Sequence, residues 1–131
     1  GPQVRWPTRC VQGPHDAARH SGLHVPHAQL IIRKGCNPSV DSYSAFTEAD
    51  RSTTTGLAAY LHARGITDVV LCGLATDYCV AWSALDARAA GFATTVIEDA
   101  CRAIDLNGSL AKAWADMAAA GVARIQSSQI L

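Results

Sequence analysis

The sequence carries no excess of charge of either sign, because eleven lysines and arginines balance eleven aspartates and glutamates. A neutral chain gives no electrostatic reason to expect nucleic acid or an anionic membrane as a partner. It also lacks an apolar run of the roughly 20 residues that a membrane-spanning helix needs. No G-x-G-x-x-G phosphate loop follows an apolar segment, which argues against a nucleotide-binding module. Neither nucleic acid nor a membrane is therefore expected as a partner.

The cysteines lack the arrangement of a disulfide framework or of a zinc knuckle. There are five of them, an odd number, and no two form a C-x-x-C pair. Most are expected to be small buried hydrophobic residues of a protein in a reducing compartment. We therefore predict a cytoplasmic location, and only Cys79 requires a different explanation.

What the sequence does contain, after an irregular start rich in proline and histidine, is an alternation of apolar β-rich runs with helical patterns. Strands are expected at 29–33, 68–71, 93–97 and 122–125, and helices from Ser52 or Thr53 to Arg64, from Thr76 to Ala90, and from a Ser109 cap to Ala119. Strands that are apolar on both faces and alternate with helices indicate a covered parallel sheet. We therefore predict one α/β domain over residues 1–131, with a doubly wound parallel sheet and helices on both faces.

Cys79 has a physical case as a nucleophile from its position. Binding sites of such sheets lie beyond the carboxyl ends of the strands. The run from Leu71 to Val80 leaves an apolar strand, turns at Gly73 and places Cys79 in the first turn of the next helix. Free backbone N–H groups and the helix dipole favour a thiolate there and can hold an oxyanion. The alternative from position alone is a buried packing cysteine.

Lys34 ends another expected parallel strand, so its ammonium group could lie near that thiolate and stabilise it. A lone lysine is otherwise more often a solvated surface charge. Its place at the functional edge of the sheet, next to Gly35, favours the first interpretation.

Three blocks of the chain, in order, resemble the nicotinamidase/pyrazinamidase family of isochorismatase-like cysteine hydrolases. They are residues 6–13 (WPTRCVQG), residues 33–35 with 41–46 (RKG and DSYSAF), and residues 73–80 (GLATDYCV). Residues 86–92 (DARAAGF) and 98–104 (EDACRAI) are similar to the family as well. The resemblance implies an isochorismatase-like hydrolase fold. It also implies an amidohydrolase that converts nicotinamide to nicotinate and ammonia through a cysteine thioester, in salvage of the nicotinamide cofactor.

The resemblance also assigns roles to individual residues. It makes Cys79 the nucleophile and Lys34 the group that supports the thiolate. It implies a cis peptide between Leu74 and Ala75 that aims the N–H of Ala75, with that of Cys79, into an oxyanion hole. The resemblance assigns substrate contacts to three further residues: Trp6, Tyr43 and Thr76. Of these, Trp6 and Tyr43 would be the aromatic walls of a pyridine pocket.

The chain departs from the family in two respects. The family's catalytic aspartate and most of its metal ligands precede the Trp-Pro block, so the chain is expected to be the C-terminal two-thirds of the fold, lacking its N-terminal strands and inactive by itself. A divalent metal (Zn, Fe or Mn) is expected from the family. Arg9, however, stands where the family usually has a histidine ligand, and arginine cannot bind a metal. No metal ligand is thus expected in this chain, and the four histidines between Pro14 and Ala28 are expected to be surface residues: His15, His20, His24 and His27.

Two alternatives remain open from the sequence. The protein could be a related cysteine hydrolase of another amide, although the paired aromatics Trp6 and Tyr43 favour a flat ring. It could instead be a catalytically inactive remnant of the fold, which the substitution at Arg9 would favour and the intact Lys34 and Cys79 oppose. A homo-oligomer is possible in either case.

Overall fold

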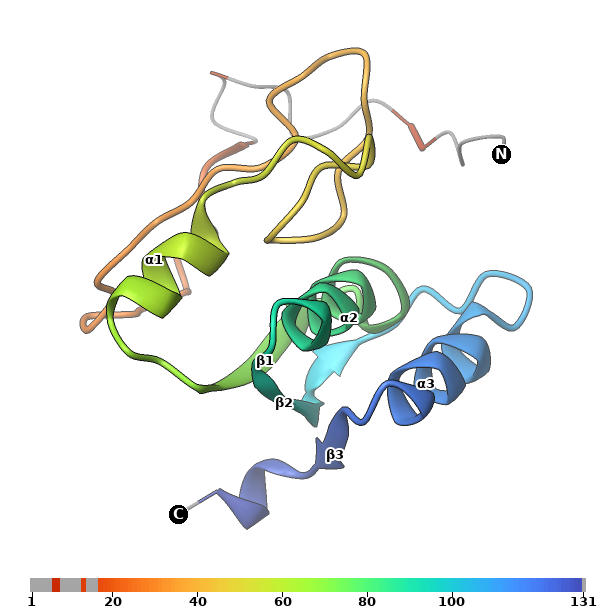
Figure 1. Ribbon diagram of the computed structural model, residues 1–131. Coiled ribbons are helices and arrows are strands. Elements are labelled where there is room, and N and C mark those ends of the chain that lie inside the picture. Colours follow the sequence, from red (N-terminus) through yellow and green to blue (C-terminus); the bar gives the residue numbers. More distant parts are fainter. Residues whose placement is uncertain (1–5, 8–12, 14–16, 131) are drawn as a thin grey trace.

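The computed structural model describes residues 6–7, 13 and 17–130 and contains a parallel sheet with helices packed against it (Figure 1). Its three strands are β1 (Asp68–Leu74), β2 (Ala93–Arg102) and β3 (Ala123–Ile125), and they lie in the order β1-β2-β3. Both pairs of neighbours are parallel. The prediction of an α/β protein with a parallel sheet is therefore confirmed. The expectations for Arg9 and His15 fall outside the described residues.

The helices follow the strands in the expected alternation. They are α1 (Leu57–Ala63), the π-helical turn η2 (Thr76–Val80), α2 (Ala81–Ala89), α3 (Ser109–Ala119) and the 3-10 turn η3 (Ser127–Gln129). The predicted helix from Thr76 to Ala90 thus exists as two consecutive parts. Gly91 and Gly121 end α2 and α3 with φ angles of 93° and 84°, a backbone conformation that glycine adopts without steric cost.

The strands run further toward their carboxyl ends than the apolar pattern indicates. β1 reaches Leu74 rather than Leu71, and β2 reaches Arg102 rather than Ile97. The two strands change register between Leu71 and Gly73, after which Gly73 pairs with Cys101. This irregularity carries the ladder past a polar stretch of β2, so hydrogen bonding rather than hydrophobicity defines the strand ends.

One face of the sheet carries the main core. Helices α2 and α3 lie side by side over it (Figure 1) and contribute Ala84 and Met117, which are fully buried against Val96 of β2. A second cluster joins α1 to the far end of α2 around Phe92. On the opposite face, Val70 and Leu74 are 59% and 71% exposed. The described part of the chain therefore covers one face of the two that the sequence predicts to be covered.

Two expected element boundaries are wrong at the start of the described chain. Residues 29–33 form no strand, and Leu30 and Ile31 are 42% and 55% exposed. An apolar β-rich run becomes a strand only when a neighbouring strand accepts its backbone hydrogen bonds, and within the described residues no strand pairs with it.

The helix expected from Ser52 or Thr53 begins instead at Leu57. Asp50 explains the difference, because its carboxylate accepts the N–H groups of Ser52 and Thr53 at 2.9 and 2.8 Å and closes a turn before the helix. Gly56, with φ 86°, occupies the N-cap position. Polar residues that can cap a helix compete equally well for a turn.

Candidate active site

The candidate nucleophile lies in a single π-helical turn between a strand and a helix. β1 ends at Leu74, the Leu74–Ala75 peptide is cis as the family resemblance implies, and η2 follows at once. The carbonyl of Ala75 accepts the N–H groups of Tyr78 and Val80 at 3.1 and 3.0 Å. Cys79 is half-buried in this turn. Single π turns are rare and occur often at functional sites.

Lys34 meets Cys79 across 45 residues of sequence. Its Nζ lies 3.5 Å from the Cys79 Sγ and donates to the Ser42 carbonyl oxygen at 3.1 Å. An ammonium group at this distance can stabilise negative charge that develops on the sulfur during a reaction. The structure therefore brings together the two residues that the sequence selects from separate strand ends, although residues 29–33 form no strand.

The backbone beside Lys34 is held by a residue that the sequence analysis missed. Gly35, with φ +68°, donates its N–H to the Glu48 Oε1 at 3.2 Å. The second carboxylate oxygen of Glu48 is buried and has no hydrogen-bond partner in the structure. Glu48 therefore fixes the position of Lys34 through its neighbour, and only a contact between residues distant in sequence could have revealed this.

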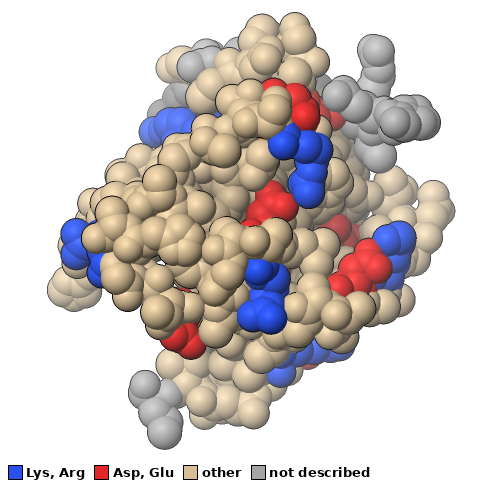
Figure 2. Space-filling model, in the orientation of Figure 1, with Lys and Arg blue, Asp and Glu red and all other residues tan. Residues whose placement is uncertain are grey.

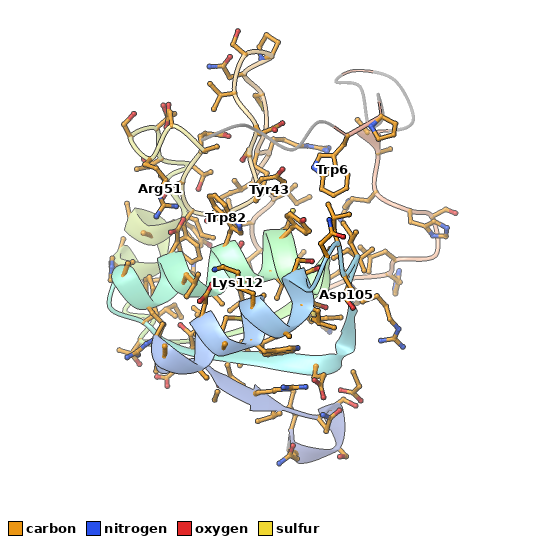
Figure 3. The ribbon with its side chains drawn as sticks, turned by 90° about the vertical axis from the view of Figure 1, so that its right-hand side faces the viewer. Trp6, Tyr43, Arg51, Trp82, Asp105 and Lys112 are labelled. Carbon is orange, nitrogen blue, oxygen red and sulfur yellow. The ribbon has the colours of Figure 1, made fainter. Side chains whose placement is uncertain are left out.

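Four aromatic side chains cluster next to the nucleophile. The Trp6 Nε1 donates to the Tyr43 hydroxyl at 3.0 Å, and the Tyr43 ring lies 5.3 Å from that of Trp82. Tyr78, the residue before Cys79, contacts both Trp6 and Tyr43 at centroid distances of 5.3 and 5.6 Å. Figure 3 shows Trp6, Tyr43 and Trp82 gathered at one side of α2.

The sequence analysis selected Trp6 and Tyr43 but missed Tyr78 and Trp82. A signal for the latter pair exists, because residues four apart share one face of a helix. The rings are tilted or edge-on to one another, so the cluster offers apolar ring faces and edges together with hydroxyl and indole N–H groups, a combination that suits an aromatic ligand. Thr76 is buried at the first residue of η2, and its contact with a substrate stays a prediction.

Asp77 is buried within η2 and fully engaged in hydrogen bonds, with 6% of its surface exposed. Its carboxylate accepts the N–H groups of Ile104 and Asp105 at 3.1 and 2.7 Å and the Ser109 hydroxyl at 2.5 Å. Burial by itself raises the pKa of Asp77, but the bonds from Ser109, Ile104 and Asp105 outweigh it and hold the pKa below its usual value. Nothing in the local sequence distinguishes this aspartate from an ordinary loop or cap residue.

Because the folded-state pKa of Asp77 is lowered, its contribution to stability should be present at neutral pH and disappear in acid. It is complete above the unfolded-state pKa of about 3.9 and is lost as the pH falls through the lower folded value. In the intact protein, the gap in urea midpoint between wild type and Asp77→Asn should therefore narrow from pH 7 to pH 3. Asp116→Asn is a suitable control, since its pair with Lys112 is exposed. A gap of constant size would contradict the assignment.

The described residues do not supply a metal centre. No group of three or more histidine, cysteine, aspartate or glutamate side chains that could hold a metal occurs among residues 6–7, 13 and 17–130. His20, His24 and His27 are exposed, and the His20 Nδ1 accepts the N–H of Gly22 at 2.9 Å. These residues do not fit a metal by themselves, so we derive no step of the reaction through one.

Charged side chains are dispersed over the face of the molecule that Figure 2 presents, with Lys and Arg scattered among Asp and Glu. Within the described part of the chain, no helix is long and apolar enough to cross a membrane.

Comparison with known proteins places the chain in a family. The isochorismatase domain matches residues 2–129. A nicotinamidase of Acinetobacter baylyi is 61% identical over 131 residues, which are 100% of this chain and 61% of that protein. The chain therefore belongs to the isochorismatase family of hydrolases. Within it the chain is similar to the nicotinamidases, as the three sequence blocks predict.

Solved structures support the same placement. An Acinetobacter baumanii nicotinamidase/pyrazinamidase superimposes with a TM-score of 0.96 at 60% identity, over 98% of this chain and 62% of that one. An L. infantum protein in complex with nicotinate gives 0.92 at 41% identity, over 97% and 63%. A pyrazinamidase of Pyrococcus horikoshii in complex with zinc gives 0.78 at 32% identity, over 93% and 63%. The chain spans about three fifths of the length of these proteins.

Proposed function

We propose that the intact protein hydrolyses the carboxamide of nicotinamide, giving nicotinate and ammonia, with Cys79 as the nucleophile. The observation that carries this proposal is the 3.5 Å approach of the Lys34 Nζ to the Cys79 Sγ beside the aromatic cluster. A cysteine activated by a cation needs only a bound acyl compound next to it to form a thioester. The similarity to nicotinamidases and to a structure that holds nicotinate supports the choice of substrate.

In the proposed reaction, the Cys79 sulfur attacks the carboxamide carbon and a tetrahedral oxyanion forms. The backbone N–H groups of Ala75 and Cys79 would hold this oxyanion, since Ala75 is the N-cap of η2 and Cys79 lies within the same short turn. The thiol proton is passed to the leaving NH2 group, which departs as ammonia and leaves a thioester. Water then cleaves the thioester to the acid and restores the thiol.

The roles of the surrounding residues follow from this chemistry. Lys34 stabilises the thiolate before attack. Trp6 and Tyr43 would receive the pyridine ring, and Tyr78 completes that aromatic surface. The family resemblance places the aspartate that would carry out the proton transfers outside the matched blocks. It places there as well most of the residues that would hold a divalent metal to position the substrate. We further propose that the protein is cytoplasmic, that residues 1–131 belong to a single domain, and that the protein forms a homo-oligomer.

A substrate panel tests the proposal against the related hydrolases. The chain shares 47% identity over 45 residues with a maleamate amidohydrolase of Pseudomonas putida, which makes an aliphatic amide the natural competitor. Ammonia release by the intact protein should show kcat/KM for nicotinamide at least about 100-fold above that for maleamate, because an aliphatic chain leaves the aromatic surface unfilled. Equal rates, or a preference for maleamate, would favour the related hydrolase. No release from any amide would favour the inactive remnant.

A further inference from the structure

The turn η2, which carries Cys79, is hydrogen-bonded through the Asp77 carboxylate to the loop before α3 and to the Ser109 hydroxyl. Ser109, the first residue of α3, donates to the Asp77 Oδ2 at 2.5 Å and accepts the N–H of Leu106 at 2.8 Å. Asp77 in turn accepts two backbone N–H groups of the same loop. Ser109 was expected to cap α3, but Gly108 occupies the N-cap position and no side-chain cap is made. Its hydroxyl is therefore committed to η2 instead.

We propose that the Asp77–Ser109 pair is a positioning device for the Cys79 thiol, acting through the π-helical turn; this rests on the function proposed above. Asp77 lies two residues before Cys79 within a turn of only five residues. A turn this short has little rigidity of its own, so its tertiary bonds determine where Cys79 points. Asp77 makes three such bonds and does not itself contact the reacting atoms.

The position of Cys79 that this pair maintains allows little displacement. Cys79 must keep its Sγ within reach of the Lys34 Nζ, now 3.5 Å away, while its own N–H faces the oxyanion. A displacement of about 1 Å of a catalytic group can cost on the order of 100-fold in rate. Loosening η2 should therefore lower the rate of the chemical step, while substrate binding by the aromatic cluster changes little.

Ser109→Ala in the intact protein tests this without removing the charge of Asp77. Ser109→Thr keeps the hydroxyl and serves as the rescue variant. Asp99→Asn is a matched control, because Asp99 makes the same kind of pair with Ser127, accepting its N–H at 2.7 Å and its hydroxyl at 2.5 Å, at the chain's C-terminal 3-10 turn. Iodoacetamide labelling of Cys79 is followed by mass spectrometry across a pH series, alongside kcat and KM for nicotinamide.

For Ser109→Ala we expect labelling of Cys79 at neutral pH to slow about fivefold, because the Sγ no longer stays within reach of the Lys34 Nζ. We also expect kcat to fall about tenfold, with KM within about twofold of wild type. Ser109→Thr should restore both quantities, and Asp99→Asn should leave both unchanged.

The proposal is overturned if Ser109→Ala lowers thermal stability while the labelling profile and kcat stay at wild-type values, because the pair is then structural only. It is also overturned if Asp99→Asn slows labelling as much as Ser109→Ala does. A wild-type protein that labels rapidly at Cys79 but releases no ammonia would overturn the proposed function alone, since the labelling still decides the role of Ser109.

Discussion

Replacing Cys79 with alanine in the intact protein is expected to lower nicotinamide hydrolysis by about 10⁴-fold or more. The reason is that, among the residues that the structure describes, Cys79 is the nucleophile in contact with Lys34, and its loss removes the whole covalent route. The measurement is ammonia release under saturating substrate, together with mass spectrometry of acid-quenched protein. A thioester adduct of the nicotinoyl group should appear on the wild-type Cys79 peptide and be missing from the variant.

Cys72→Ala is the matched control for this experiment. Cys72 is an exposed thiol on β1. Among the described residues, the hydrogen-bond partners of the Lys34 Nζ are Ser42 and Cys79, not Cys72. Its removal should leave turnover within about twofold of wild type, as expected for a surface change away from the chemistry. Substantial turnover by Cys79→Ala would show that another group carries the reaction. A loss of turnover in Cys72→Ala, with an unchanged melting temperature, would indicate that Cys72 rather than Cys79 is the nucleophile.

Phe92→Ala is expected to cost about 3–5 kcal/mol of unfolding free energy, the largest stability effect that we expect from one substitution. Phe92 is 1% exposed and stacks on the His62 ring at a centroid distance of 4.5 Å. It also contacts the Phe46 ring at 6.1 Å. Truncation leaves a cavity where α1, α2 and β2 meet, and these elements are too constrained to collapse into it. Urea unfolding of the intact protein measures the loss.

Leu23→Ala provides the comparison for a side chain of similar apolar character outside the core. Leu23 is 58% exposed, so its truncation should change the free energy of unfolding by less than about 0.5 kcal/mol. A loss below about 1 kcal/mol for Phe92→Ala would mean that this second cluster rearranges freely. In that case α1 would not be fixed to α2 in the way that the structure shows.

The order and type of the elements were predictable because they follow from periodicity. The helix ending at Ala119 and the strand beginning at Ala93 have the boundaries that the sequence indicates. The failures share a physical cause: they depend on partners that periodicity does not encode. Residues 29–33 needed a neighbouring strand, and the start of α1 depended on whether Asp50 closed a turn.

The site was predictable to the same limit. Position and family resemblance together selected Lys34 and Cys79, and the structure brings them into contact. Tyr78, Glu48 and the Asp77 network were missed, because each acts through a contact with residues far away in the sequence. A carboxylate such as Asp77 has no local signature that separates a buried anchor from a solvated loop residue. Only the fold distinguishes them.

The aromatic cluster also gives the protein an optical property. Trp6 and Trp82 both lie against Tyr43, close enough for excited tyrosine to transfer its energy to indole. Trp114, on α3, instead stacks against Arg124 of β3, whose guanidinium carbon lies 4.1 Å from the ring centroid. Two of the three tryptophans therefore emit from the candidate active site, and the third emits from elsewhere. Most of the tryptophan emission of this chain is thus expected to come from the place where the substrate is proposed to bind. The tryptophan fluorescence of this chain is therefore expected to report occupancy of the site, with Trp114 as the contribution from outside it.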